Sequence, residues 1–467
     1  MNAPTTSERA PGLQSVTFVR WKSVAAAEME LSTLTLLVGT NASGKSNVIE
    51  GLKLLQWMAR GIPFTQYPLN ADRRPIRGTP DSFVNVQSAA SNGDFGFDCR
   101  VGLDSDTDPL MWSLRLKAAP SDATFRVETE TLTSEGSSSR FPLYQAFKQG
   151  EVGNLLRVDY NNFARGGKKP SIDAVDTQPV FAQLQVPSRF AATRKTSQAT
   201  IPPACVALQH HLQSMLFLDP EPASMRQWSP VAMRELAGDG HNISSVLYAL
   251  CQESADSKAQ VLEFVRALPD QDITDVLFDS TSRNEVMLKL EESFGGQHRP
   301  VDITLLSDGT LRVLAIAGAL LAASPGTTVV IEEIDNGVHP SRARQLLQNI
   351  RSTAERRGLR VLITTHNPAL MNALPPEAIG DVVLCYRTGT ETNGNGAARI
   401  AGTTSLTRLR DLPGFTRIVT HGSLGQSAAD GVLEREATAH PPGSEKAPRF
   451  SAWLDEFFAT STTNSAH

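Results

Sequence analysis

The chain of 467 residues has few cysteines and no excess of one charge. Its four cysteines are far apart and form no CxxC pair, which excludes a zinc ribbon or a disulfide framework and is typical of buried thiols in a reducing cytoplasm. They are Cys99, Cys205, Cys251 and Cys385. With 44 basic and 49 acidic residues the formal charge is −5, so any contact with nucleic acid must come from a local basic patch.

Long apolar runs are also missing, since no stretch approaches the ~20 residues that span a bilayer. Residues 1–12 are polar and contain neither a basic n-region nor an apolar h-region, so we expect a flexible tail and no signal peptide. Internal repeats and sustained heptads are absent from the sequence. A hydrophobic fraction of 40% and a charged fraction of 20% predict a soluble globular protein, here expected in the cytoplasm. The length predicts more than one core.

The N-terminal third has the pattern of strands around one helix. Residues 34–38 are almost wholly apolar, as a strand buried on both faces should be, and 47–59 has apolar residues at helical spacing. Two more strands are predicted at 15–21 and 26–31. Three short runs at 95–103, 111–117 and 125–132, separated by Asp, Ser and Pro clusters, predict an antiparallel meander.

The rest of the chain divides into an irregular middle and a regular C-terminal part. Residues 157–195 hold seven basic residues around ARGGKKP, which predicts an exposed basic loop. Helical periodicity is seen over 206–217 and 243–268. Residues 302–374 read as loop, helix, buried strand, helix and buried strand, the alternation of an α/β layer. A linker at 437–448 precedes a short amphipathic helix at 450–459.

The most specific motif is a phosphate-binding loop. Gly39-Thr40-Asn41-Ala42-Ser43-Gly44-Lys45-Ser46 matches GxxxxGK[ST] between a buried strand and an amphipathic helix. Glycines let the backbone wrap a polyanion, amide groups at a helix N-terminus face it, a lysine reaches the outer phosphates and a hydroxyl contacts Mg²⁺. The helix that follows starts with Asn47.

Three weaker patterns lie in the C-terminal part. The apolar strand in TVVIEEID ends in Glu332 and Glu333, His366 follows another apolar strand in LITTH, and LSDGT (with Ser307 and Gly309) opens a helix. Taken singly, each also fits a surface carboxylate, a solvated histidine or a simple helix cap.

In this order the four elements resemble the head of ABC-type ATPases: Walker A, signature, Walker B and D-loop, then H-switch. The resemblance implies that ATP and Mg²⁺ are bound, that Lys45 and Ser46 contact phosphates and Mg²⁺, and that Glu332 supports the metal. Glu333 would be the general base and His366 the γ-phosphate sensor. Ser307 and Gly309 would complete the site of a second subunit, and Asp335 would lie in the D-loop. Two positions depart from the family or stay unplaced: Glu332 stands where the family has Asp, and Gln87 is only a candidate for the Q-loop.

The same resemblance predicts the fold: an α/β ABC head with a mixed core sheet, an antiparallel β-subdomain and a helical insertion. The expected parts are a flexible tail (1–12), an N-terminal lobe with Walker A and the β-subdomain (13–150), and an insertion with the basic loop and helices (151–300). A C-terminal lobe (301–436) and the linker with its short helix (437–467) follow. Arg20 or Trp21 could flank the adenine, although both could simply pack.

Among ABC ATPases, the sequence is unlike transporter subunits, because about 260 residues separate Walker A from the signature. It also lacks the heptads and zinc hook of the SMC and double-strand-break repair proteins. LVGTNASGKSNVIEGL and IEEIDNGVHPSR are similar to the stand-alone AAA-type ATPases of anti-phage systems such as Septu, PARIS and retrons. After His366 there is no acid-rich cluster like that of OLD nucleases, so the nuclease is expected on a separate effector.

Two functions stay open. The first is an oligomeric ATPase that acts as sensor and scaffold for a separately encoded effector, a nuclease, in anti-phage defence. The second is a DNA-binding repair or recombination ATPase similar to RecF, with DNA bound by the basic stretch.

Overall fold

The computed structural model describes the chain in segments. These are residues 11–67, 76–85, 93–103, 107–119, 124–136, 141–149, 153–266, 273–294, 297–334, 340–388, 391–392, 398–399, 402–412, 415, 418 and 423–439. Four predictions lie wholly or mostly outside them: the flexible tail at 1–12, of which only residues 11 and 12 are described, the Q-loop candidate Gln87, the D-loop residue Asp335 and the C-terminal helix at 450–459.

One large mixed sheet organises the described residues, in the order β10-β15-β16-β3-β17-β20-β2-β1-β4-β5-β6-β7-β8-β9. The first five strands run parallel to one another. They are β10 (Leu216–Leu218), β15 (Thr328–Ile331), β16 (Arg360–Thr365), β3 (Leu34–Val38) and β17 (Val382–Thr388). This α/β architecture with a mixed core sheet confirms the predicted fold class.

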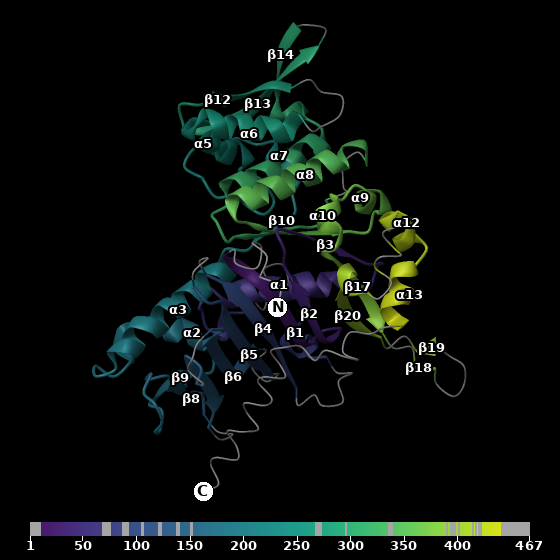
Figure 1. Cartoon of the computed structure of the whole chain (residues 1–467). Coiled ribbons are helices and arrows are strands. Elements are labelled where there is room, and N and C mark those ends of the chain that lie inside the picture. Colours follow the sequence, from purple (N-terminus) through teal and green to yellow (C-terminus); the bar gives the residue numbers. More distant parts are fainter. Residues whose placement is uncertain are drawn as a thin grey trace.

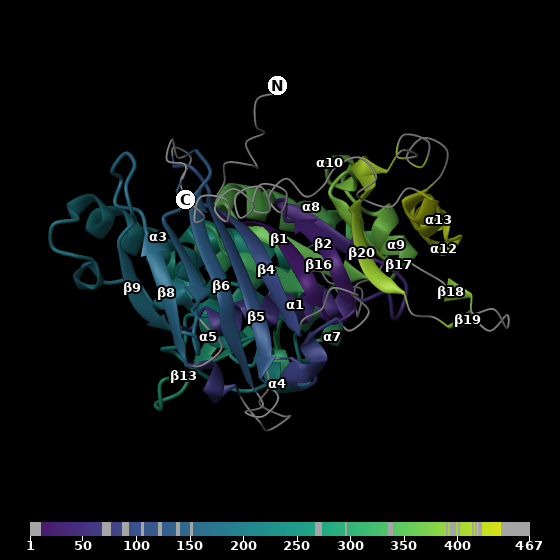
Figure 2. The ribbon, with the colours of Figure 1, turned by 90° about the horizontal axis from the view of Figure 1, so that it is seen from below.

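Beyond β17 the sheet becomes mostly antiparallel. Its remaining strands are β20 (Thr403–Arg408), β2 (Val24–Glu30), β1 (Gly12–Trp21), β4 (Asp94–Gly102), β5 (Leu110–Ala119), β6 (Thr124–Ser134), β7 (Tyr144–Lys148), β8 (Leu155–Tyr160) and β9 (Ser171–Val175). From β2 to β9 each strand is antiparallel to its neighbour, so the predicted meander is confirmed. Figure 2 shows these strands side by side.

Helices and a second sheet cover the parallel strands. The longer helices are α1 (Lys45–Met58), α3 (Lys195–Gln213), α5 (Ile243–Glu253), α6 (Ala255–Arg266), α7 (Asp308–Ala322), α8 (Pro340–Arg357) and α13 (Val432–Ala439). The shorter ones are α2 (Val180–Gln183), α4 (Pro222–Met225), α9 (Pro368–Asn372), α10 (Pro376–Ile379) and α12 (Leu424–Ala429). The second sheet contains β11 (Ser229–Pro230), β12 (Ile273–Ser280), β13 (Glu285–Phe294) and β14 (Gln297–Asp302). Figure 1 shows α5 to α8 and β12 to β14 gathered at one end of the molecule, and the antiparallel strands at the other.

The parallel strands are buried on both faces, as the apolar run at 34–38 predicts. On β3, Leu36 belongs to a core cluster with α7 and α8, whereas Leu37 belongs to a second cluster with α1 and the antiparallel strands. Strand β15 alternates in the same way, with Val329 on the first side and Val330 on the second. Two cores therefore share these strands, which accounts for the size of the chain.

Three local predictions were wrong. Leu216–Leu218 is not the end of a helix, because α3 stops at Gln213 and the three residues pair with β15 instead. The helix predicted over 243–268 is two helices, because Ser254 is extended (φ −158°) and its hydroxyl accepts a hydrogen bond from Ser257 N (3.0 Å). The linker predicted at 437–448 was placed too early in the sequence, because helix α13 continues to Ala439 and Ala437 is buried.

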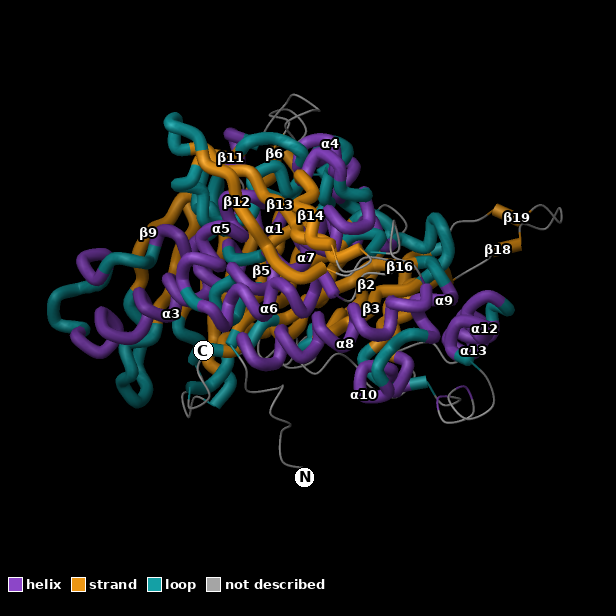
Figure 3. Tube along the Cα trace, turned by 90° about the horizontal axis from the view of Figure 1, so that it is seen from above, coloured by secondary structure: helices purple, strands orange, loops and turns teal. Residues whose placement is uncertain are grey.

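The region 151–300 contains more strand than predicted. Strands β8 and β9 extend the main sheet, and β12 to β14 form most of the second sheet, so the region is not only a basic loop with helices. The basic loop itself is confirmed as exposed: Arg165 and Lys168 lie at the surface between β8 and β9. A small hairpin, β18 (Glu391–Thr392) with β19 (Ala398–Arg399), lies apart from the body in Figure 3.

Candidate nucleotide site

The phosphate-binding loop, residues 39–46, connects the carboxyl end of β3 to the first turn of α1. The amide groups of a helix's first turn have no partner within the helix, so they are suited to an anion. The Lys45 ammonium turns back onto the loop and donates to the carbonyls of Gly39 (2.5 Å) and Thr40 (3.1 Å). Burial lowers the pKa of Lys45, while nearby charges, including Glu333, oppose that shift.

Glycine is required at both ends of the loop. A Cβ on Gly39 would lie 2.8 Å from Ser43 Oγ and closer still to the carbonyl oxygen of Cys385 on β17. Gly44 caps α1 with φ +116°, and a Cβ there would lie 2.7 Å from Thr404 Cγ2 and closer still to its hydroxyl. The sequence motif thus reflects close packing of the loop against β17 and β20.

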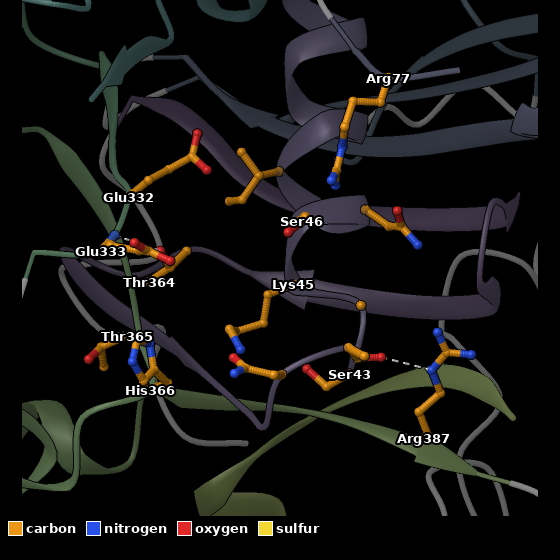
Figure 4. Close-up of a pocket in the computed structure, with 15 residues that line it drawn as sticks. Ser43, Lys45, Ser46, Arg77, Glu332, Glu333, Thr364, Thr365, His366 and Arg387 are labelled. Carbon is orange, nitrogen blue, oxygen red and sulfur yellow. Dashed lines mark hydrogen bonds between the residues drawn. The ribbon is translucent and has the colours of Figure 1, made fainter. Parts of the chain in front are cut away.

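One cleft of about 350 Å³ lies over this loop and gathers several predicted site residues (Figure 4). Strands β3, β15 and β16 are parallel neighbours, so the segments after their carboxyl ends meet at one edge of the sheet. The cleft is lined by Asn41, Ala42, Ser43, Gly44, Lys45, Ser46, Asn47, Ile49, Arg77, Glu332, Glu333, Thr364, Thr365, His366 and Arg387. The structure therefore brings Lys45, Glu333 and His366 together from three places in the chain.

Glu333 has an unusual backbone. Its φ is +48°, a left-handed conformation that is rare for residues other than glycine, and its N–H donates to Thr364 Oγ1 (3.0 Å). Ala42, in the phosphate-binding loop, is also left-handed at φ +65°. Such conformations cost about 1–3 kcal/mol each and concentrate at functional sites. Both of these residues line the cleft.

Glu332 and Ser46, the two predicted metal-binding residues, both line the cleft, but Glu332 also has a protein partner. Its carboxylate pairs with Lys53 Nζ on α1 at 2.7 Å, and both side chains are about 30% exposed. Lys53 lies two turns beyond Lys45 on the same helix, so the sequence periodicity could have indicated this neighbour. An ion on Glu332 would share the carboxylate with Lys53.

His366 follows β16 and leads into α9. The Asn367 N–H donates to Thr365 Oγ1 (3.0 Å), and Asn367 Oδ1 accepts from Ala369 N (2.9 Å), capping the helix. These bonds fix the backbone on either side of the histidine. Figure 4 shows the ring at the same side of the cleft as Glu333 and Thr364.

The signature residues do not line this cleft. Ser307 caps α7, accepting a hydrogen bond from Thr310 N (3.2 Å), and Gly309 lies in the first helical turn. The start of α7 is further held by Arg226, which bonds to Leu306 O (2.9 Å) and Asp308 Oδ1 (2.7 Å). Ser307 and Asp308 are exposed. A role in a second subunit's site stays a prediction.

For the two adenine candidates on β1, the packing alternative fits Trp21, whereas adenine contact by Arg20 stays a prediction. Trp21 is fully buried against Phe83, Phe95 and Phe97, and Arg20 pairs with Asp94. Neither is among the cleft residues.

Two cleft arginines were missed by the sequence reasoning. Arg77 donates to Glu50 on α1 (2.5 Å), and Arg387, near the end of β17, donates through Nε to Ala42 O (3.1 Å). Neither lies in a motif. A charged residue at the end of an apolar strand was the only signal for Arg387.

Comparison with known families finds one partial match. Residues 253–372 match the family model described as "AAA domain, putative AbiEii toxin, Type IV TA system". The matched segment holds Glu332, Glu333 and His366 but not the phosphate-binding loop, and it is about a quarter of the chain. It supports an ATPase of the AAA type. None of the curated proteins compared with this chain matches it.

Solved SMC heads cover most of the chain at low similarity. They include an SMC head bound to the C-winged helix domain of ScpA (12% identity, 85% of this chain and 98% of that one, TM-score 0.43). Another is the SMC head domain from Thermotoga maritima (13% identity, 85% of this chain and 98% of that one, TM-score 0.39). A Pyrococcus furiosus head with an extended coiled coil, bound to the C-terminal domain of ScpA, is the third (10%, 88% and 99%, 0.41). At TM-scores this low, the likeness supports no conclusion about this chain.

Two negative findings concern the described residues only. None of their helices is long and apolar enough to cross a membrane. Nor do they contain a group of three or more His, Cys, Asp or Glu side chains placed to hold a metal ion. A cation held in the cleft by a single carboxylate would therefore need further ligands, such as a hydroxyl or phosphate oxygens.

Proposed function

We propose that this chain binds ATP in the cleft and hydrolyses it to ADP and phosphate. The observation that carries the proposal is the meeting of the phosphate-binding loop with Glu333 and His366, which are about 290 and 320 residues further along the chain. A loop at a helix N-terminus with a lysine suits a triphosphate, and a carboxylate in the same cleft suits activation of water.

Each residue then has a defined task. The amides of residues 41–46 and the Lys45 ammonium hold the phosphates, and Lys45 exchanges its bonds to Gly39 and Thr40 for phosphate oxygens. Glu333 accepts the proton of the attacking water, with its backbone held by Thr364. His366 donates to the terminal phosphate and senses its presence.

Mg²⁺ fits the donor set at this site. Ser46 offers a hydroxyl and Glu332 a carboxylate, the hard oxygen ligands that Mg²⁺ prefers, and phosphates supply the rest. When bound, Mg²⁺ neutralises charge on the phosphates.

We also propose that two copies of the chain complete each other's sites. Ser307 and Gly309 lie at the N-terminus of α7, away from the cleft, where the capping hydroxyl of Ser307 and the amide groups of the first turn would meet the phosphates of a second copy. The capped N-terminus of α7 is therefore the surface expected to close over a partner's nucleotide.

The hydrolysis proposal is tested by two variants. Lys45→Ala removes the ammonium at the loop, and we expect it to lose ATP binding in calorimetry. Glu333→Gln should bind ATP but hydrolyse it about 10²–10⁴ times more slowly, the range for a positioned base. Full activity of Glu333→Gln together with loss in Glu332→Gln would reverse the assignment of the two carboxylates.

The composite site is tested by mixing two inactive proteins. Ser307→Arg should abolish hydrolysis and keep ATP binding. A mixture of Ser307→Arg with Lys45→Ala should recover part of the activity, because one site of each mixed dimer then has an intact loop and an intact signature. A mixture no more active than its two components would favour a site made by one chain.

For the cellular role, we propose a sensor and scaffold that holds or releases a separately encoded effector, a nuclease, in anti-phage defence. Support comes from the sequence phrases around the loop and the acidic pair, and from the matched family, whose description includes a putative toxin of a type IV TA system. Native mass spectrometry with ATP, with and without the product of the adjacent gene, tests this. A protein that never retains that product would count against an effector.

The alternative, a RecF-like repair ATPase that binds DNA, is favoured by one observation: the loop between β8 and β9 exposes Arg165 and Lys168. With Lys169 these side chains could neutralise about three phosphates, so DNA binding should weaken steeply with salt, and replacing all three by Ser should flatten that dependence. No binding by the wild type at low salt would remove this alternative.

A further inference from the structure

The phosphate-binding loop is backed by two strands from the far C-terminal part of the chain. Strand β17 runs parallel to β3, with Val382 beside Leu36 and Leu384 beside Val38, and the Cys385 carbonyl then lies against Gly39 at the start of the loop. Strand β20 is antiparallel to β17 and places Thr404 directly opposite Arg387. These two cross-strand partners both reach the loop.

Thr404 fills the space under the loop. It is 1% exposed, and its hydroxyl donates to the carbonyl of Ser43 (2.8 Å) while lying 2.7 Å from the hydroxyl of Ser23. Ser23 in turn accepts from the Asn47 side chain (2.6 Å) in the first turn of α1. One buried hydroxyl thus connects the loop, its helix and the turn between β1 and β2.

Arg387 holds the preceding carbonyl. Its Nε donates to Ala42 O (3.1 Å), the bond drawn in Figure 4, and its Nη1 donates to Gly402 O (2.7 Å). Arg387 also lines the cleft, so it adds a second positive charge to the cleft that contains Lys45. Arg387 and Thr404 therefore donate hydrogen bonds to two successive carbonyls of the loop, those of Ala42 and Ser43.

These two hydrogen bonds affect the conformation of the loop. A loop that directs its N–H groups at an anion leaves its carbonyls needing other donors, and an unpaired carbonyl would favour a different conformation. Ala42 already adopts a left-handed φ of +65°, which the backbone holds only when its surroundings fix it.

We propose that Arg387 and Thr404 are positioning residues that hold the phosphate-binding loop in its nucleotide-binding conformation before the nucleotide arrives. The proposal rests on the proposed function, because the ligand is the phosphate chain of ATP. A preorganised loop binds more tightly, since the ordering cost is already met in the free protein.

The first test separates the Thr404 hydroxyl from the Thr404 bulk. We expect Thr404→Val to raise the Kd for ATP about tenfold, the effect of one lost hydrogen bond, and Thr404→Ser to restore tight binding. The matched control is Thr407→Val on the same strand, whose hydroxyl lies 3.2 Å from Tyr386 Oη and not against the loop. Calorimetric titration with ATP gives the Kd, and thermal melting of the free proteins gives their stability.

A purely structural role predicts a different pattern. It would lower the melting temperature of Thr404→Val and Thr407→Val alike and leave the Kd of both near the wild-type value, which would overturn the proposal. Poor rescue by Thr404→Ser would also overturn it, because the hydroxyl would then not be the active group.

The second test uses Arg387, whose exposed side chain can be replaced without disturbing a core. Arg387→Gln should raise the Kd for ATP about tenfold. The Kd of Arg387→Lys should lie between those of the wild type and Arg387→Gln, because an ammonium keeps the charge but cannot reproduce the guanidinium's bonds to two carbonyls. Arg351→Gln, at a surface pair with Glu377, is the control. This test stands even if Thr404→Val fails to fold.

The outcomes distinguish this proposal from the proposed function. If the wild type binds no ATP, the proposed function fails. If the wild type binds ATP and both Thr404→Val and Arg387→Gln bind it equally well, only the positioning proposal fails.

Discussion

Replacing Gly44 by alanine tests how tightly the phosphate-binding loop is packed. Two costs add at this position. The backbone has φ +116°, which costs an L-residue about 1–2 kcal/mol. The new Cβ would also lie 2.7 Å from Thr404 Cγ2 and nearer still to its hydroxyl, and overpacking of this kind costs about 1–3 kcal/mol. We expect a total destabilisation of about 2–5 kcal/mol.

The Thr404 side chain cannot move aside without further loss, because its hydroxyl bonds to Ser43 O and contacts Ser23. The clash should therefore displace the loop, and ATP binding should fall along with stability. Urea unfolding with and without ATP, together with calorimetric titration, measures both effects.

Gly153→Ala is a closely matched control. Gly153 has φ +115°, almost the same as Gly44, but nothing lies within 4 Å of a Cβ added there. It should lose only the conformational part, about 1–2 kcal/mol, and keep ATP binding. The double variant Gly44→Ala with Thr404→Ala should show a favourable coupling, because the truncation removes the two nearest atoms.

The reasoning would be refuted by a Gly44→Ala protein that loses no more stability than Gly153→Ala and binds ATP normally. In that case the approach of Thr404 to the loop would have no energetic consequence.

Two further predictions concern charged groups. Burial raises the pKa of Glu130 above its usual 4.5, against the hydrogen bonds from Tyr144, Val180, Trp112 and Phe181. A raised carboxyl pKa contributes stability below pH 4.5 that is lost as the pH rises through the pKa of the folded state. The urea midpoint of the wild type should therefore fall as the pH rises from 4.5 through that pKa, and Glu130→Gln should make this fall less steep. An equally steep fall in Glu130→Gln would contradict the raised pKa. Lys53→Gln should lower the Mg²⁺ concentration for half-maximal hydrolysis by up to about fivefold, because Glu332 no longer shares its carboxylate with a lysine. The control is Lys258→Gln, at a similarly exposed ion pair with Asp275, which should leave this Mg²⁺ concentration unchanged. Equal Mg²⁺ dependence in all three proteins would show that Lys53 does not compete with the ion.

Local pattern alone was enough to predict the elements that carry the candidate site. The apolar run at 34–38 is strand β3, and the periodicity after the loop is helix α1. The sequence also indicated that β15 and β16 are buried strands followed by polar groups. Parallel strands place such groups at one edge, and the resemblance to ABC-type heads implied that Glu333 and His366 lie near Lys45.

Other elements could not be predicted because their cause lies far away in the chain. Leu216–Leu218 has helical neighbours and helical spacing, yet it is a strand because the exposed edge of β15 offers three backbone partners. Likewise, β8 and β9 exist because the meander before them leaves an edge to extend. Pairing of this kind depends on what the rest of the sheet leaves open.

The hydrogen bonds that hold the phosphate-binding loop also depend on residues far away in the chain. Arg387 and Thr404 lie in no motif, and they act on Ala42 and Ser43 only because β17 aligns with β3 and β20 aligns with β17. The sequence by itself determined which backbone could wrap a phosphate chain, because that depends on neighbouring residues. Only the tertiary structure decided which distant side chains satisfy the carbonyls of that backbone, because a hydrogen bond depends on distance in space and not on separation along the chain.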